Sequence, residues 1–376
     1  MEFDKTLKQN QKIMKNFKLF LFISIISIGY SQEKYSQSIT SDDLKELLMK
    51  FASDEFEGRE AGKQGQKLAV NFIRDFYKKN NINPAKGTED YFQKMQIDLP
   101  GKMVTLPYQY PDSVRGYVGE ESLERLKNFM PDSNDLKDLT DIDTVVNSEN
   151  VAAIIEGSEY PDQYIVITAH LDHVGKRGED IYNGADDDGS GSVALLEIAQ
   201  AFKLAQEDGN GPKRSIVILH VTAEEKGLLG SEFYTDYPLY PLEQTITNLN
   251  VDMIGRTDPN RGSDNDRYIY LIGSDRLSTM LHETSERINK ETVNLELDYT
   301  FNAPDDPNNF YERSDHFNFA KNNIPVIFYF SGTHEDYHGP GDTPDKIRYD
   351  LLTERTKLIF NTAWEIANME DKIVVD

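Results

Sequence analysis

From Asn150 onward, short apolar runs alternate with longer segments in which apolar residues recur every third or fourth position. Runs with the length and β-branched content of buried strands are 151–155, 164–168, 215–223, 247–254, 267–273 and 324–330. Segments with the apolar spacing of helices are 192–205, 277–291 and 350–369. Strands that alternate with helices predict a layered α/β fold around a mostly parallel sheet.

Metal-ligand types of side chain follow three of these runs. His170 follows the run 164–168, Glu224 and Glu225 follow the run ILHVTA, and Asp252 comes directly after LNV. In sheets of this class, ligand sites gather at the carboxyl ends of the strands. We therefore expect three strand ends to deliver these side chains to one edge of the sheet.

The segment NGADDDGSG, residues 183–191, places three consecutive acids in a glycine-rich turn before a predicted helix. By itself it is equally compatible with an acidic loop that caps the helix. The pair Glu224 and Glu225 is more specific. Adjacent residues that leave a strand point in opposite directions, so one carboxylate can bind a metal while the other accepts a proton from water. Two solvated acids at a helix start are the alternative.

The seven histidines differ in their surroundings. His170 and His338 are the best ligand candidates, and His173 and His334 are their rivals by spacing alone. His220 lies within an apolar run and is expected to be a core residue. His282 falls in a helical pattern, and His316, in RSDHFNF, is expected to shape a pocket wall.

Composition narrows the chemistry. The formal net charge of −25 disfavours nucleic acid and anionic membrane surfaces as partners. The absence of cysteine excludes disulfides, thiolate nucleophiles and cysteine-type zinc sites, which leaves histidines and carboxylates for any metal.

The first 31 residues resemble a secretory signal peptide. Five lysines precede the apolar run 19–28, and small residues follow it, although Met14 is an alternative start. The run is too short for a permanent membrane span, because a helix needs about 20 apolar residues to cross a bilayer. We therefore expect a protein exported to the periplasm or secreted.

After a polar joint at 32–40, the rest of the chain reads as one domain, 41–372. Helices are predicted from Ser41 to Phe51 and around 68–77, joined by the glycine-containing connector 55–67. Residues 100–148 contain four prolines and many aspartates, and we interpret them as an insertion with one helix at 123–130.

Five motifs together, AHLDH, NGADDDGSG, TAEEKGLLGS, NVDMIG and DYHGPGDT, resemble those of the co-catalytic di-zinc aminopeptidase superfamily. That superfamily includes secreted bacterial leucyl aminopeptidases, glutamate carboxypeptidase II, glutaminyl cyclases and the transferrin receptor ectodomain. The resemblance spans about residues 41–372 and is strongest from 150 to 348. It implies a three-layer αβα sandwich with a central mixed, mostly parallel sheet.

The resemblance also implies a site with two Zn²⁺ ions. His170 and Asp252 would bind one, Glu225 and His338 the other, and Asp187 would bridge both. Glu224 would be the general base, Asp172 would orient His170, and Tyr311 would donate a hydrogen bond to the developing oxyanion. A cis peptide bond would join Asp187 to Asp188.

The function implied is a zinc-dependent exopeptidase that removes the amino-terminal residue from peptides with a free amino terminus. A non-catalytic binding protein on the same scaffold, a glutaminyl-cyclase-like enzyme and a carboxypeptidase are the alternatives. Side-chain preference and oligomeric state cannot be read from the sequence.

Overall fold

The computed structural model describes residues 32–98, 102–104, 116–118 and 145–376. The expected signal peptide, the predicted helix at 123–130 and most of the expected insertion lie outside these ranges. Residues 145–148 are predicted to belong to the insertion, but they form the start of a strand of the main sheet, where they pair with residues 95–98. No helix within the described ranges combines the length and apolar character needed to cross a membrane.

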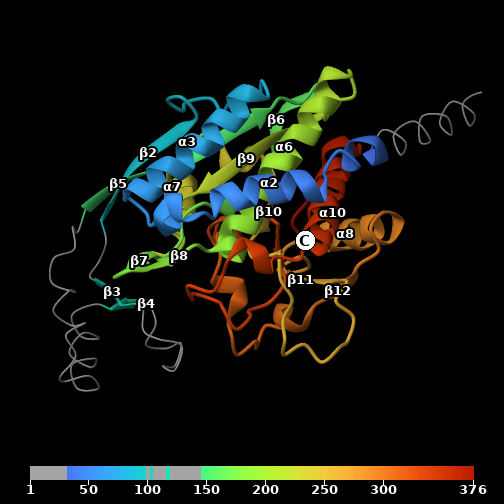
Figure 1. Ribbon diagram of the computed structural model, residues 1–376. Coiled ribbons are helices and arrows are strands. Elements are labelled where there is room, and N and C mark those ends of the chain that lie inside the picture. Colours follow the sequence, from blue (N-terminus) through green and yellow to red (C-terminus); the bar gives the residue numbers. More distant parts are fainter. Residues whose placement is uncertain (1–31, 99–101, 105–115, 119–144) are drawn as a thin grey trace, which may run out of the picture.

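A nine-stranded mixed sheet forms the centre of the molecule (Figure 1). Its central strands are parallel and lie in the order β9 (Arg214–Val221), β6 (Tyr160–His170), β10 (Thr245–Val251) and β13 (Val326–Phe330). On the β9 side the next strand is the antiparallel β5 (Val145–Ile155), which in turn pairs with β1 (Asn83–Pro84) and β2 (Phe92–Asp98). On the β13 side the next strand is the antiparallel β11 (Tyr268–Ile272), which pairs with the parallel β12 (Glu296–Asp298).

Two small hairpin sheets lie apart from the main one. They are β3 (Lys102–Val104) with β4 (Gly116–Val118), and β7 (Gly175–Arg177) with β8 (Asp180–Tyr182).

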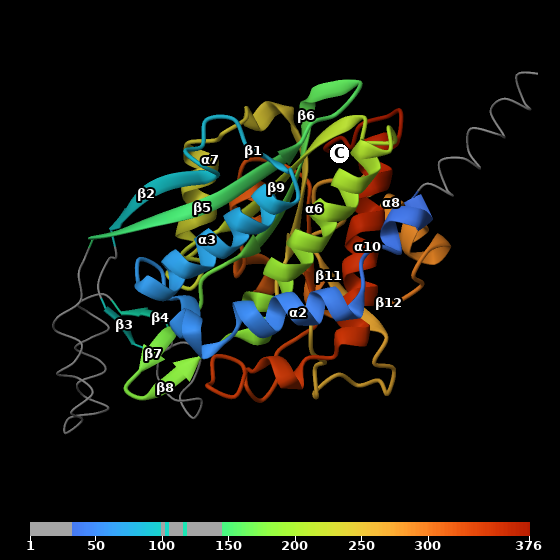
Figure 2. The same ribbon diagram turned by 45° about the horizontal axis from the view of Figure 1, so that its top comes forward.

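Helices cover both faces of the sheet, as the expected αβα sandwich requires (Figure 2). Alternate residues of β6 and β9 point to opposite faces: Ile165 and Ile218 join the larger core, whereas Val166 and Leu219 join the smaller one. The larger core contains residues of α2 (Ser41–Phe51), α3 (Gln64–Lys79), α6 (Gly191–Glu207), α8 (Thr279–Glu291) and α10 (Tyr349–Asn368). The smaller core contains residues of α7 (Leu229–Asp236) and α9 (His316–Lys321).

The helix α2 has the predicted bounds, with Thr40 as its N-cap, whose hydroxyl accepts the Asp43 N–H at 3.2 Å. The helix α3 starts at Gln64 and ends at Lys79 with Asn80 as its C-cap, so it is longer at both ends than the predicted 68–77. The predicted connector 55–67 is therefore too long, because its last four residues form the first turn of α3.

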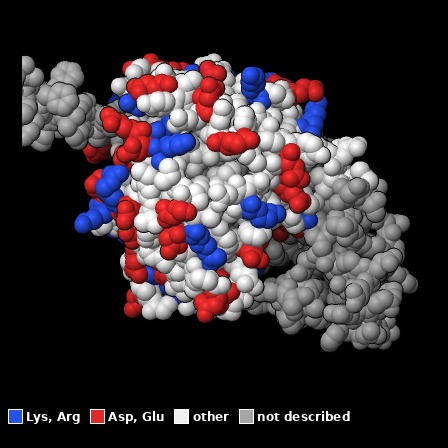
Figure 3. Space-filling view, turned by 180° about the vertical axis from the view of Figure 1, so that it is seen from behind, with Lys and Arg blue, Asp and Glu red and all other residues white. Residues whose placement is uncertain are grey.

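The surface seen from behind carries acidic side chains interspersed with Lys and Arg (Figure 3). The negative excess of the chain is therefore not gathered into a single patch on this face.

His220 is a core residue, as predicted. It is fully buried in β9, and its Nε2 lies 2.6 Å from the Tyr77 hydroxyl. Burial lowers the pKa of His220 to about 3, whereas an unfolded histidine titrates near 6.5. Between these values the unfolded chain binds a proton that the native chain does not, so stability falls as the pH falls.

We expect this histidine to contribute about 1.4 kcal/mol per pH unit to the loss of stability between pH 6 and 4. Urea unfolding of the wild type and of His220→Gln, at a series of pH values, measures the contribution. The variant should lose less stability than the wild type over that interval. Parallel curves would contradict the prediction.

Candidate metal centre

The five predicted ligands come from five segments that meet at the carboxyl edge of the central strands. His170 is the last residue of β6, and Asp252 follows β10. Glu225 follows β9 by four residues, Asp187 precedes α6, and His338 lies in the loop between β13 and α10. The parallel arrangement of β9, β6 and β10 brings their ends side by side, as predicted.

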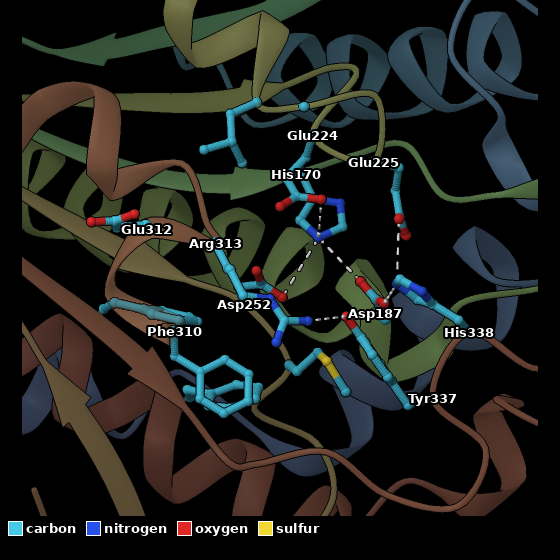
Figure 4. Close-up of a pocket in the computed structure, with 15 residues that line it drawn as sticks. His170, Asp187, Glu224, Glu225, Asp252, Phe310, Glu312, Arg313, Tyr337 and His338 are labelled. Atoms are coloured by element: carbon cyan, nitrogen blue, oxygen red, sulfur yellow. Dashed lines mark hydrogen bonds and ion pairs between the residues drawn. The ribbon is translucent and has the colours of Figure 1, made fainter. Parts of the chain in front are cut away.

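The distances divide these residues into two sets that share Asp187 (Figure 4). His170 Nε2 lies 3.1 Å from Asp187 Oδ1 and 3.5 Å from Asp252 Oδ1. His338 Nε2 lies 3.1 Å from Asp187 Oδ2 and 3.3 Å from Glu225 Oε2. One oxygen of Asp187 therefore faces each set, which is the arrangement that a bridging carboxylate needs.

Several donor atoms of this cluster are buried without a hydrogen-bond partner among the described residues: His170 Nε2, Asp187 Oδ2 and Glu225 Oε1. An unsatisfied buried polar group costs about 1–3 kcal/mol, and more when it is charged. Carboxylates and imidazoles are the non-cysteine ligands that zinc prefers. The donor set therefore fits divalent cations.

A pocket of about 370 Å³ opens over the cluster. All five predicted ligands line it, together with Glu224. Its remaining lining contains five apolar side chains, Leu228, Met253, Phe310, Phe328 and Phe330, together with Gly227, Glu312, Arg313 and Tyr337. The pocket can therefore hold an apolar group beside a charged centre.

Glu224 lies within the pocket, on the His170 side. Its Oε2 is 4.0 Å from His170 Nε2, and its side chain is 12% exposed. Burial, partly offset by His170, raises the pKa of Glu224 well above its ordinary value. A carboxylate that faces a pocket and has a raised pKa is suited to take up a proton.

Asp172 contacts the ring of His170, as its predicted orienting role requires, but it does so with its backbone and not with its side chain. The backbone carbonyl oxygen of Asp172, not its carboxylate, lies 3.0 Å from His170 Nδ1. The carboxylate of Asp172 instead accepts the Glu224 N–H at 3.1 Å. Asp172 thus contacts both the imidazole and the backbone of the predicted base.

The bond between Asp187 and Asp188 is cis, which confirms the prediction. The carboxylate of Asp188 accepts N–H groups from three segments: His170 at 3.1 Å, Gly191 at 2.9 Å and Met253 at 3.1 Å. Asp188 therefore ties together the backbones of the segments that carry the cluster.

The oxyanion role predicted for Tyr311 stays a prediction. Tyr311 is not among the residues that line the pocket. Its ring lies under the Arg276 guanidinium, 4.0 Å from the centroid, and edge-on to His316. In the short helix at 310–312, Phe310 lines the pocket, and Tyr311 is partly buried and packs against two clusters of apolar residues, which contain Phe319 and Phe330.

The tyrosine that lines the pocket is Tyr337, which sequence reasoning missed although it directly precedes His338. Its ring stacks on His338 with centroids 3.9 Å apart, and its hydroxyl accepts a hydrogen bond from Arg313 at 3.4 Å (Figure 4). Burial raises the pKa of Tyr337 to about 12, so the phenol stays protonated at neutral pH. Its position beside a predicted ligand was the available signal.

His316 lies behind the pocket wall rather than in it. Its ring stacks on Phe328, which lines the pocket, with centroids 4.8 Å apart. His282 lies in α8 next to Ser274, and His334 Nε2 is 3.3 Å from Asp186 Oδ2. Of the two rivals, His334 therefore contacts the neighbour of Asp187, whereas His173 reaches the cluster itself.

Arg59 is a second residue that the sequence did not reveal. Its guanidinium is fully buried and donates to the carbonyl oxygens of Leu171, Asn183, Gly184 and Phe51 at 2.9, 2.6, 2.8 and 3.3 Å. Leu171 follows His170, and Gly184 precedes the acidic turn. Arg59 therefore joins the two loops on which His170 and Asp187 stand.

Fold and site together define an α/β protein with a centre of imidazoles and carboxylates at the edge of a parallel sheet. The family model described as peptidase family M28 matches residues 150–363, which include all five predicted ligands. The match covers more than half of the chain, and the chain belongs to this family.

Among curated proteins, aminopeptidase NAALADL1 of Rattus norvegicus is 35% identical over 150 residues, which are 38% of this chain and 19% of that protein. A probable leucine aminopeptidase of Trichophyton verrucosum is 26% identical over 224 residues, 58% of this chain and 57% of that protein. The chain therefore spans less than two thirds of the length of either relative.

Solved structures confirm the fold. The LapA aminopeptidase of Legionella pneumophila aligns with a TM-score of 0.61 at 19% identity, over 91% of this chain and 76% of that one. The zinc aminopeptidase BSAP of Bacillus subtilis aligns with a TM-score of 0.61 at 17% identity, over 88% of this chain and 96% of that one.

Proposed function

We propose that this protein is a zinc-dependent aminopeptidase that holds two zinc ions and removes the amino-terminal residue from peptides. The observation that carries the proposal is the placement of Asp187, with one oxygen toward His170 and Asp252 and the other toward His338 and Glu225. These five residues would hold the two ions. Relatives that are named aminopeptidases support the choice of reaction.

The three carboxylate ligands offset most of the charge of two divalent cations and leave the site electrophilic. When bound, zinc supplies Lewis acidity, which lowers the pKa of a water molecule and polarises a carbonyl group. Glu224 accepts the proton of the attacking water and passes it to the leaving amine. Tyr337, rather than Tyr311, donates a hydrogen bond from its hydroxyl to the oxyanion.

The apolar walls favour a hydrophobic side chain on the residue that is removed. Leu228, Met253 and three phenylalanines line the pocket beside the cluster. Burial of an apolar side chain there contributes about 25 cal/mol per Å² removed from water. Leucyl and phenylalanyl substrates are therefore expected to be cleaved faster than glutamyl ones.

A panel of aminoacyl anilides tests the function. Hydrolysis should require a free amino group, stop on chelation and return when zinc is added. Equal hydrolysis of amino-acetylated substrates would overturn the exopeptidase assignment. Cleavage of acetylated peptides from their carboxyl end would support a carboxypeptidase, and bound zinc without any hydrolysis would support a binding scaffold.

The two tyrosines make a matched pair for testing the oxyanion role. Tyr337→Phe removes only a hydroxyl at the pocket and should lower kcat about 100-fold with little change in KM, because the lost hydrogen bond forms in the transition state. Tyr311→Phe removes the same group behind the pocket and should leave kcat within about threefold of the wild type. Steady-state kinetics on one anilide compares them. Equal losses would contradict this assignment.

We also propose that the protein is exported, on the strength of the lysine-rich start and apolar run of residues 1–31. Cell fractionation with amino-terminal sequencing of the mature chain tests this. An uncleaved chain in the cytoplasm would overturn it.

A further inference from the structure

A third imidazole lies beside Glu225 and Asp187, outside the five-residue set. His173 is fully buried and does not line the pocket, whereas the His338 side chain is 27% exposed. His173 Nδ1 lies 2.7 Å from Glu225 Oε1 and 3.8 Å from Asp187 Oδ2. The two carboxylates therefore have His338 on their pocket side and His173 on their protein side.

The atoms that face one another here have no hydrogen-bond partners among the described residues. This holds for both ring nitrogens of His173, for Glu225 Oε1 and for Asp187 Oδ2. One ligand atom from each of these three residues lies within 4.8 Å of the others. The imidazole nitrogen and the two carboxylate oxygens thus converge on one another, which is an arrangement that a cation can satisfy.

Packing holds the His173 ring in this place. A Cβ atom added at Gly184 would lie 2.5 Å from the Cγ and Cδ2 atoms of His173, so the ring rests directly on the Gly184 backbone. The carbonyl of Gly184 accepts a hydrogen bond from Arg59. The position of the ring is therefore fixed by the same arginine that joins the two ligand loops.

We propose that His173 is a fourth protein donor to the cation held by Asp187, Glu225 and His338. The proposal rests on the zinc-binding part of the proposed function. On the His170 side, the proposed protein donors are His170, Asp252 and the shared Asp187, although a carboxylate oxygen of Asp188 also lies within 4.8 Å of donor atoms of His170 and Asp252. The nearby Asp188 carboxylate already accepts three backbone N–H groups.

The two cation positions are therefore unequal. Four protein donors close a zinc site, whereas three leave a place for water or substrate. The open position lies on the His170 side, where Glu224 stands. The cation on the His338 side is retained more firmly, and the cation on the His170 side exchanges first.

Release of zinc from the fully loaded protein into a chromogenic chelator tests this inequality. The wild type should release its zinc in a fast and a slow phase. In His173→Phe, which keeps a ring on Gly184, the slow phase should accelerate at least 10-fold, within the 10- to 100-fold range seen when the surroundings of a metal are altered. His316→Phe, at another buried imidazole, should leave both phases unchanged.

X-ray absorption at the zinc edge separates coordination from positioning. The wild type should show about three imidazoles for two zinc ions, and His173→Phe about two. A wild-type count of about two would overturn the proposal, even if release accelerates, because His173 would then only position Glu225. Unchanged release would also overturn it.

The wild-type count requires no substitution, so it decides the question even if the variant does not fold. Failure of this inference is distinct from failure of the proposed function. Two bound zinc ions and three imidazoles in a protein without peptidase activity would overturn the function alone.

Discussion

Glu224→Gln is expected to retain both zinc ions and to lose about 10³-fold in kcat. The substitution keeps the size of the side chain and a carbonyl oxygen, but an amide cannot accept the proton of the attacking water. General base catalysis contributes about 10²- to 10⁴-fold. KM should change little, because the lost interaction acts in the transition state.

The measurement pairs steady-state kinetics with zinc content by elemental analysis. Glu232→Gln is a matched control, because Glu232 is exposed in α7, eight residues from Glu224, and does not line the pocket. That variant should behave as the wild type does. Activity of Glu224→Gln near that of the wild type would remove the assignment of the base, and loss of zinc would make Glu224 a ligand.

Arg59→Met is expected to lower the free energy of unfolding by about 4 kcal/mol, which is among the largest effects of a single substitution. Methionine fills much of the same volume but removes the donors of four carbonyl oxygens, of which only Gly184 keeps another within the described part of the chain, the Gly189 N–H. Each buried group that is left fully unsatisfied costs about 1–3 kcal/mol before relaxation. The affinity for zinc should fall as well, because the loops that carry His170 and Asp187 lose the hydrogen bonds by which Arg59 connects them.

Urea unfolding and zinc titration check this second prediction. Arg74→Met is the control, because Arg74 makes ion pairs with Asp75 and Asp90 at the surface, and such pairs contribute only about 0–1 kcal/mol. If the two variants proved equally stable, the inferred role of Arg59 would be wrong.

Apolar runs were sufficient to predict the central strands, because β9, β10, β13 and the second half of β6 are buried on both faces and rich in apolar residues. They did not predict β2, an edge strand of alternating polar and apolar residues that pairs with β5. The boundary of the insertion was misplaced for the same reason, since β5 begins at Val145 to make that pairing.

The ligands could be predicted because each one stands at the end of a strand or in a loop anchored to one. The sequence could not show whether Tyr311 or Phe310 lines the pocket, because both lie in one short turn of helix whose orientation depends on the fold. The role of Arg59 depends on contacts with segments more than 100 residues away, and the role of His173 depends on its burial. Neither long-range contact nor burial leaves a pattern in the neighbouring sequence.

The carboxylate of Asp188 makes its three hydrogen bonds with main-chain amides alone. The backbone that carries His170, Asp187 and Asp252 is therefore held by bonds within the protein, and the side chains proposed to hold the metal take no part in these bonds. We expect the binding of zinc to reorient side chains at this site and to leave the main chain in place.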